Sequence, residues 1–448
     1  MGRKLGESNF EEPNDPTNPL GVGTNSIAVG NQASATGSYS SSFGTNTTAE
    51  ADNSHAEGSG TWAQGQASHA EGTDTQTIGA NAHSEGLSTT ASGDNSHTEG
   101  KSTEASAEEA HAEGLDTTAS GKAAHSEGNG SIASGESAHA EGTGTLAEGI
   151  WSHAEGYNTE SSADATHTEG YETKASGDYA HAEGYTTEAF GRSSHAEGDY
   201  SKANGRGSHA EGTNTASDGV TYLATRTATD GSQSVTISAT TAEGTGSHAE
   251  GIMSYAKGYG SHAEGEKTTA WNTASHSEGS GTLATGIASH AEGTNTTASA
   301  LNSHAEGGQS KATGTNAHAE GNKTTASGHT SHAEGVETVA SGEGSHAEGY
   351  KTKSTAQYSH AEGESTTASG AMSHAEGSDT EASGDGSHAE GYSTLAEGEA
   401  SHAQNDSTIA YGYASHAEGY GTYSEGDYSH AEGEATSALG LTSHAEGF

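Results

Sequence analysis

Histidine and glutamate recur in this sequence in a regular pattern that could support catalysis or binding. Of 28 histidines, 27 recur at 14-residue intervals, and in 26 of these 27 units a glutamate follows two residues later. Only His329 lies out of register, and the one irregular step is the 39 residues from His209 to His248. An imidazole beside a carboxylate can transfer protons, bind a metal ion or form an ion pair. The pattern therefore raises catalysis, metal binding and structural pairing as three alternatives.

Known catalytic motifs do not fit this repeat. The sequence His-Ala-Glu resembles part of the zinc-deaminase signature, but that signature needs cysteine ligands and the chain has no cysteine. The HExxH pattern of zinc proteases is also absent. A catalytic site usually occurs once, whereas a motif repeated 27 times indicates architecture. We therefore expect no enzyme activity and no cofactor.

The elements that position these residues are short strands between tight turns. Glycine follows the motif histidine by three residues in 26 of 27 units, as at Gly58, Gly72 and Gly86. The exception is Asn405, and asparagine is the residue that best replaces glycine where φ is positive. A second, less strict glycine closes each unit, which leaves segments of about five residues that are too short for helices. The spacing predicts an all-β parallel β-solenoid of about 29 coils, stacked at about 4.8 Å per coil into a rod of about 130 Å.

Composition indicates where the two faces of each strand lie. Only 28% of the residues are hydrophobic and the formal net charge is -47, so a large apolar core is excluded. Side chains alternate along a strand, so we expect the small Ser, Ala and Thr residues inside the coil and the His and Glu residues outside. Ile27, Val29 and Phe43 stand upstream in the places that His and Glu take later. We therefore predict that this outer face is buried between chains.

Four segments follow from the pattern. Residues 1–24 contain all three prolines and are expected to be an extended linker or attachment segment. Residues 25–219 and 245–448 form the coils, and residues 220–244 form an inserted β-hairpin, which either contacts a receptor, clasps a neighbouring chain or is a tolerated insertion. The residues singled out in this hairpin are Tyr222, Leu223, Arg226, Asp230 and Gly231.

The first complete coil carries a family resemblance. The sequence from Asn25 to Gly30, NSIAVG, resembles the head repeat of YadA-like trimeric autotransporter adhesins, and the Ser-His-Ala-Glu-Gly form resembles repeats in tail fibres of phages and phage-like particles. The resemblance extends over residues 25–448 and implies a left-handed β-roll that forms a homotrimer. It also implies a structural fibre with an adhesive or receptor-binding role, most simply a tail fibre; the alternative is an extracellular or cell-surface adhesin. A polysaccharide depolymerase is disfavoured because every acidic motif is repeated.

The resemblance also suggests partners and location. We expect an anchoring protein of the particle or surface to bind residues 1–24, and a cell-surface receptor or glycan to bind the fibre, with recurrent tyrosines as a possible glycan contact. The negative charge disfavours nucleic acid, and no apolar run of 18 residues is present, so no membrane insertion is expected. The N-terminal residues lack the apolar segment of a signal peptide. We therefore expect synthesis in the cytoplasm and a place on a particle tail or outside the cell.

The resemblance assigns the His–Glu face to the trimer interface. We hypothesise that His and Glu of three chains form a continuous hydrogen-bonded ladder, because unpaired glutamates about 4.8 Å apart would repel one another. Regular metal binding is disfavoured, since such close levels would crowd divalent ions. Pairing is expected to raise the pKa of the histidines and lower that of the glutamates, which places the highest stability at mildly acidic pH. The ladder residues are His55, Glu57, His69, Glu71, His83, Glu85, His97, Glu99, His248, Glu250, His304, Glu306, His444 and Glu446.

Overall fold

The computed structural model describes residues 23–213, 224–227, 234–237 and 239–447. Two compact units divide the chain, Met1–Ser208 and His209–Phe448. In the described residues of both units, strands are the only regular elements. None of these residues forms a helix long and apolar enough to cross a membrane.

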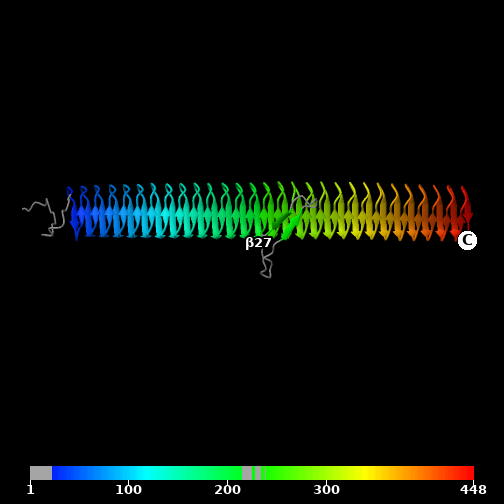
Figure 1. Cartoon of the computed structure of the whole chain (residues 1–448), viewed down its shortest axis with the longest axis horizontal. Helices are drawn as coiled ribbons and strands as arrows, with labels where there is room; N and C mark the ends of the chain where they lie inside the picture. Colours follow the sequence, from blue (N-terminus) through cyan, green and yellow to red (C-terminus); the bar gives the residue numbers. More distant parts are fainter. Residues whose placement is uncertain (1–22, 214–223, 228–233, 238, 448) are drawn as a thin grey trace, which may run out of the picture. The chain divides into compact units, whose positions relative to one another are not determined.

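Each coil contains one long and one short strand. In the first unit the coils begin with β1 (Ile27–Val29) and β3 (Ser41–Thr45), after which every long strand starts at a motif histidine, from β5 (His55–Ser59) to β25 (His195–Asp199). The short strands start seven residues after the histidine, from β6 (Trp62–Ala63) to β26 (Lys202–Ala203). In Figure 1 these strands lie side by side along the unit.

The second unit repeats this plan. Its long strands run from β27 (His209–Thr213) and β31 (His248–Ile252) to β59 (His444–Glu446), and its short strands run from β30 (Thr241–Ala242) to β58 (Ser437–Ala438). The strand β27 pairs directly with β31, so His209 aligns with His248 across the irregular step of 39 residues. The insertion thus leaves the stacking register intact.

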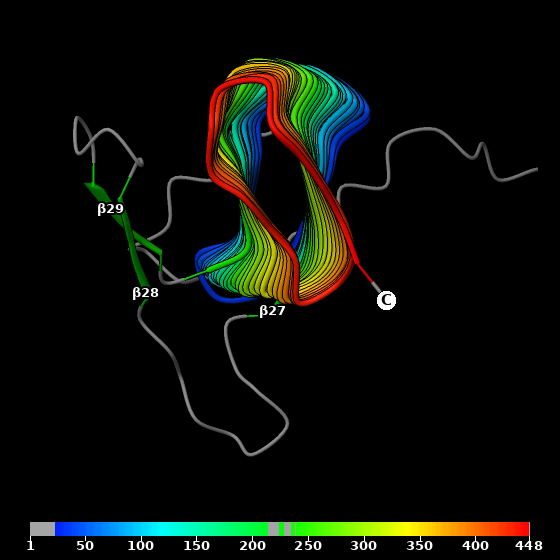
Figure 2. The ribbon, with the colours of Figure 1, turned by 90° about the vertical axis from the view of Figure 1, so that its right-hand side faces the viewer.

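Parallel pairing brings identical positions of successive coils into line. In β11 (His97–Lys101) and β13 (His111–Leu115), His97 aligns with His111 and Glu99 with Glu113. Backbone hydrogen bonds also connect each coil to the next one along the chain. For example, the amide of His97 donates to the carbonyl of Ala110 at 2.9 Å. Figure 2 looks along the stack and shows each coil as a flattened loop with two sides. The all-β parallel solenoid with 14-residue coils is confirmed.

The interior of each coil holds small side chains. In one coil Ala56, Thr61 and Ala63 are each 0% exposed, and alanines in the same places form the core of both units. The serine before the histidine closes a turn, as where Ser96 Oγ donates to the carbonyl of Gly93 at 2.6 Å. A core of methyl and hydroxyl groups buries little apolar surface per coil, so backbone hydrogen bonds between coils carry much of the cohesion.

Three positions per coil have a left-handed backbone. The first is the motif glycine, with φ of +115° at Gly58, and Asn405 takes the same region with φ of +82°. A Cβ atom at Gly58 would also overlap the carbonyl oxygen of Gly72 in the next coil, so glycine is needed for close stacking as well as for conformation. The other two positions lie two residues before and five residues after the histidine, and they include Trp151 and Thr186. Sequence analysis did not identify these two, because many residue types occupy them.

The segment that interrupts the coils contains two further strands. β28 (Ala224–Thr227) pairs antiparallel with β29 (Ser234–Ile237), and Arg226 aligns with Val235. This is the pairing of a hairpin, the structure predicted for residues 220–244. Tyr222, Leu223, Asp230 and Gly231 lie outside the described residues, as does most of the predicted attachment segment 1–24.

Candidate functional site: the histidine and glutamate columns

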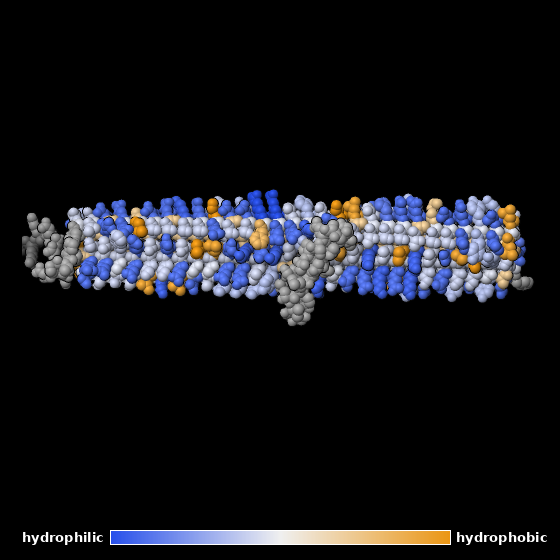
Figure 3. All heavy atoms as spheres, viewed as in Figure 1, coloured by the Kyte–Doolittle hydropathy of each residue, from blue (hydrophilic) through white to orange (hydrophobic). Residues whose placement is uncertain are grey.

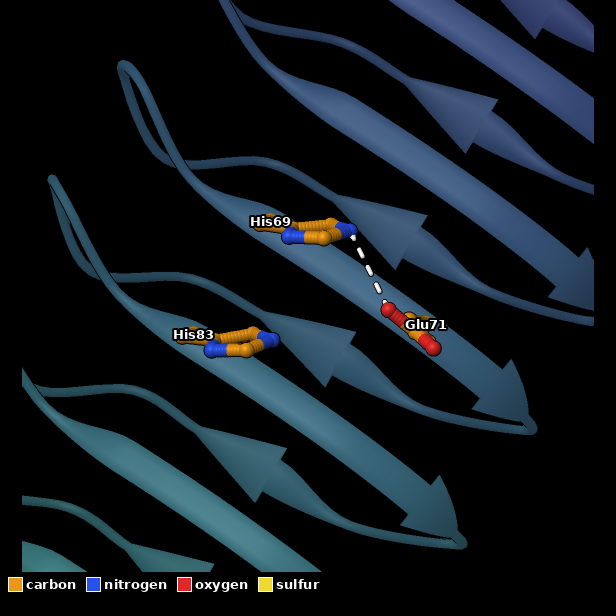
Figure 4. A group of neighbouring side chains, drawn as sticks. All are labelled: His69, Glu71 and His83. Carbon is orange, nitrogen blue, oxygen red and sulfur yellow. Dashed lines mark ion pairs between the residues drawn. The ribbon is translucent and has the colours of Figure 1, made fainter.

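The long strands place the motif histidine and glutamate on the same outer face. They are two residues apart, so both point away from the interior alanine between them. Figure 4 shows this for His69 and Glu71, with the ring of His83 in the next coil parallel to that of His69. The side chains of His69 and Glu71 are 39% and 48% exposed. In-register pairing repeats this arrangement and produces a column of histidines beside a column of glutamates in each unit, here called the His–Glu columns.

The imidazole rings stack within their column. Ring centroids of His139 and His153 are 4.8 Å apart and their planes differ by 3°. In the second unit, the rings of His346 and His360 are 4.7 Å apart, also at 3°. At a few levels the rings turn, as between His55 and His69, whose planes differ by 88°. The spacing equals that of paired strands, so the backbone register sets the column.

Histidine and glutamate of one chain lie close but are seldom hydrogen-bonded. His55 Nε2 and Glu57 Oε2 are 3.2 Å apart. At most other levels the ion-pair distance is longer, such as 3.8 Å between His83 and Glu85. These longer distances exceed a normal hydrogen bond. Within the described residues, one chain by itself therefore does not form a continuous hydrogen-bonded ladder, and the ladder between three chains remains a prediction.

Many histidine Nε2 atoms are left buried without a hydrogen-bond partner. In the described part of the first unit they include those of His97, His111, His139 and His153. A buried polar atom without a partner costs about 1–3 kcal/mol, so a column of them is an unfavourable surface for an isolated chain. The His–Glu columns therefore have bonding capacity that a ligand or another chain can use.

The single chain lowers the pKa of many of these histidines. The pKa of His69 is lowered from its ordinary value, first by loss of solvation and then by the charges of His55 and His83, while Glu71 and Glu57 act in the opposite direction. The pKa of His111, His153, His276 and His416 is lowered as well, with desolvation as the largest cause. In the single chain burial comes first, and neighbouring imidazoles add to it, so these shifts run opposite to the raised values expected within a three-chain ladder, which stay a prediction.

The glutamate column lines a groove in the first unit. The groove has a volume of about 560 Å³ and is lined by Glu99, Glu113, Glu127 and Glu141 with their following glycines. The hydrogen bond that protonated Glu127 donates to Glu113, burial and the charge of Glu141 raise the pKa of Glu127 to about 7. The pKa of Glu113 is lowered, mainly by its bond to Glu127. In the single chain the pKa shifts of Glu113 and Glu127 thus have opposite directions, because these two carboxyl groups share a proton.

Apolar residues stand at the head of both columns. Register places Ile27 over Ser41 and then His55, and Val29 over Phe43 and then Glu57. Ile27, Val29 and Phe43 are 44%, 42% and 36% exposed. The sequence analysis placed them on the outer face, and the structure has them there. Their burial between chains stays a prediction.

A second column on the surface consists of tyrosines. The rings of Tyr157 and Tyr171 are 5.0 Å apart, those of Tyr171 and Tyr185 are 4.9 Å apart, and each pair of planes differs by 8°. Tyr200 closes the column with an edge contact to Tyr185 at 5.4 Å. On the face shown in Figure 3, hydrophobic residues are scattered among hydrophilic ones. Among the described residues, face-to-face stacking of tyrosine rings is thus a local feature of the first unit.

Comparison with known proteins identifies the repeat. The YadA head domain repeat (2 copies) matches residues 22–47, 35–61, 112–138, 126–150 and 319–345. The matched segments lie in both units and include histidine-containing coils as well as the apolar first coils. The chain therefore contains YadA-like head repeats, as the NSIAVG sequence suggested. No curated protein matches the chain significantly.

Proposed function

We propose that this chain is a non-enzymatic structural fibre protein that forms a homotrimer and binds a receptor, as a tail fibre of a phage or phage-like particle. The observation that carries the proposal is the presence of YadA-like head repeats, an adhesin-type repeat, in both units. Uniform repetition supports a structural role, since the same outer face recurs at every coil.

The His–Glu columns support association with copies of the same chain. Each column presents buried Nε2 atoms without partners next to carboxylates that are about half exposed. A neighbouring chain with the same 14-residue spacing can place a carboxylate opposite each imidazole at every level. The apolar side chains of Ile27, Val29 and Phe43 would then be covered at the end of the same interface. Three chains are the number that the adhesin head type implies.

Receptor contact is assigned to features that break the repeat. The tyrosine column from Tyr157 to Tyr185 offers exposed aromatic side chains for a glycan or a protein receptor. The inserted segment 220–244, which contains Arg226, offers a contact or a clasp. Residues 1–24 are assigned to attachment, because the repeats start directly after them.

An extracellular or cell-surface adhesin is the second candidate, and the family match itself favours it. Both candidates use the same trimer and differ in what holds the fibre. Neighbouring genes separate them: tail and baseplate genes support the particle fibre, whereas secretion genes support the adhesin.

Light scattering of the purified chain tests the proposal. A mass three times the 44.6 kDa of one chain is expected. A monomer at micromolar concentration would overturn the trimer and leave the His–Glu columns exposed. Electron microscopy of the same sample should show fibres with a threefold cross-section.

A further inference from the structure

We propose that the His–Glu columns bind divalent transition-metal ions of the zinc class, each held by two histidine Nε2 atoms of successive coils and one glutamate carboxylate between them. One such set is His139, Glu141 and His153 in the first unit. This inference goes beyond the fibre role, and it rests on the geometry of a single chain.

The donor atoms of this set are close together and available. One ring nitrogen of His139, one of His153 and one carboxylate oxygen of Glu141 all lie within 4.8 Å of one another. Both Nε2 atoms are buried and make no hydrogen bond in the described part of the chain. Glu141 lines the carboxylate groove, so an ion can approach from solvent. Figure 4 shows the equivalent set of His69, Glu71 and His83, in which the Nε2 edge of His69 faces the carboxylate.

The donor types fit a borderline transition metal. Two imidazoles and one carboxylate are a common ligand set for Zn²⁺, and open positions are filled by water. Zn²⁺ bonds to nitrogen and oxygen are about 2.0–2.2 Å long, so the two rings must turn toward the ion from their parallel arrangement. The column accommodates turned rings elsewhere, with planes at 50° between His83 and His97.

Overlap between sets limits how many ions bind. His153 belongs to one set with His139 and Glu141 and to another with Glu155 and His167. An ion at one level therefore uses the histidine that the next level needs, and ions at adjacent levels would repel one another. If ions bind only at every second coil, no histidine is shared and no two ions lie at adjacent coils. This spacing also answers the objection that close levels would crowd divalent ions.

Equilibrium dialysis of the chelator-stripped full chain against Zn²⁺ tests this site. Several ions per chain are expected, at no more than one per two coils. The variant E141Q/E155Q should bind about one ion fewer, since it removes both sets that contain His153. Gln404 already occupies this place in another coil, so glutamine fits the fold. The matched control is H329Q, which changes the exposed histidine outside the repeat register and should leave the ratio unchanged.

Two results would overturn the site. One is that the native chain retains no Zn²⁺ at micromolar free ion, and the other is that E141Q/E155Q, with an unchanged circular dichroism spectrum, binds as many ions as the native chain. Light scattering with and without chelator keeps this test separate from the fibre proposal. A trimer without zinc uptake overturns the metal site alone, and a monomer that takes up zinc overturns the trimer alone.

Discussion

The imidazole ring of His402 lies 4.8 Å from that of His388, and their planes differ by 1°. This stacking persists although the coil of His402 carries Gln404 and Asn405 in place of glutamate and glycine. His402 instead has an ion-pair contact of 3.5 Å with Glu390 of the preceding coil. The histidine column is therefore set by strand register, and the glutamate of the same strand is not needed for it.

Thermal stability should rise with pH from 5 to 7.5 in metal-free buffer. The folded chain lowers the pKa of histidines such as His69, His111 and His276 below the ordinary value of 6.5. The unfolded chain then binds more protons than the folded one around and below that value, so stability is fully present above pH 6.5 and is lost as pH falls through the folded pKa. Melting curves by circular dichroism check this. A maximum at mildly acidic pH, as the sequence alone suggested, would show that pairing with glutamate dominates.

Glu127 should make a local contribution to stability that falls as pH rises, opposite to the effect of the histidines. Its pKa is raised to about 7, so its stabilising hydrogen bond with Glu113 is present in the protonated form and is lost as pH rises through 7. In E127Q the amide imitates the protonated carboxyl group at every pH. The variant should therefore melt above the native chain at pH 8 and close to it at pH 5.5. The control E104Q, at an exposed glutamate of β12 (Glu104–Ala105), should give the same difference at both pH values.

Substitution of a motif glycine by alanine should destabilise the fold far more than substitution of another glycine that also has a positive φ. At Gly156 φ is +112°, and a Cβ atom would overlap the carbonyl oxygen of Gly170. We expect G156A to lose about 2–5 kcal/mol of stability, which combines backbone strain with overpacking. At Gly130 φ is +68°, and a Cβ atom would meet nothing within 4 Å. G130A should cost about 1–2 kcal/mol.

Hydrogen exchange of the amides in coils around the two sites can measure this difference, because repeat arrays open locally. If the amides around both sites were equally protected from exchange in G156A and G130A, the extra Cβ atom at position 156 would not weaken the contact between coils. In that case the positive φ alone, and not close stacking, would account for glycine at the motif position.

The repeat made most of the fold predictable, and the limits of prediction have physical causes. A 14-residue period with glycine after His-Ala-Glu leaves only short strands, and alternation assigns Ala56 to the interior and His55 to the outside. The left-handed positions at Trp151 and Thr186 were missed because stacking between coils, rather than residue type, forces that backbone.

The chemistry of the columns was harder to predict. Sequence spacing places His and Glu two residues apart but does not set the distance between their side chains. Within one chain that distance is 3.8 Å for His83 and Glu85, which is longer than a normal hydrogen bond. In the single chain burial, followed by the charges of the imidazoles in the adjacent coils, lowers the pKa of His97. Spacing along the chain carries no information on desolvation.

The tyrosine column should stabilise the first unit measurably. Tyr171 stacks on Tyr157 on one side and on Tyr185 on the other, at 5.0 and 4.9 Å. Stacked aromatic pairs are stabilising, so Y171A should lower the melting temperature of the chain. The matched control is Y392A, whose ring is 54% exposed and stacks on no other aromatic ring in the described part of the chain. It should change stability by less than about 0.5 kcal/mol. If Y171A melts like Y392A while its binding to a glycan array is lost, the column serves recognition alone; if both stability and binding are unchanged, the stacked rings contribute to neither.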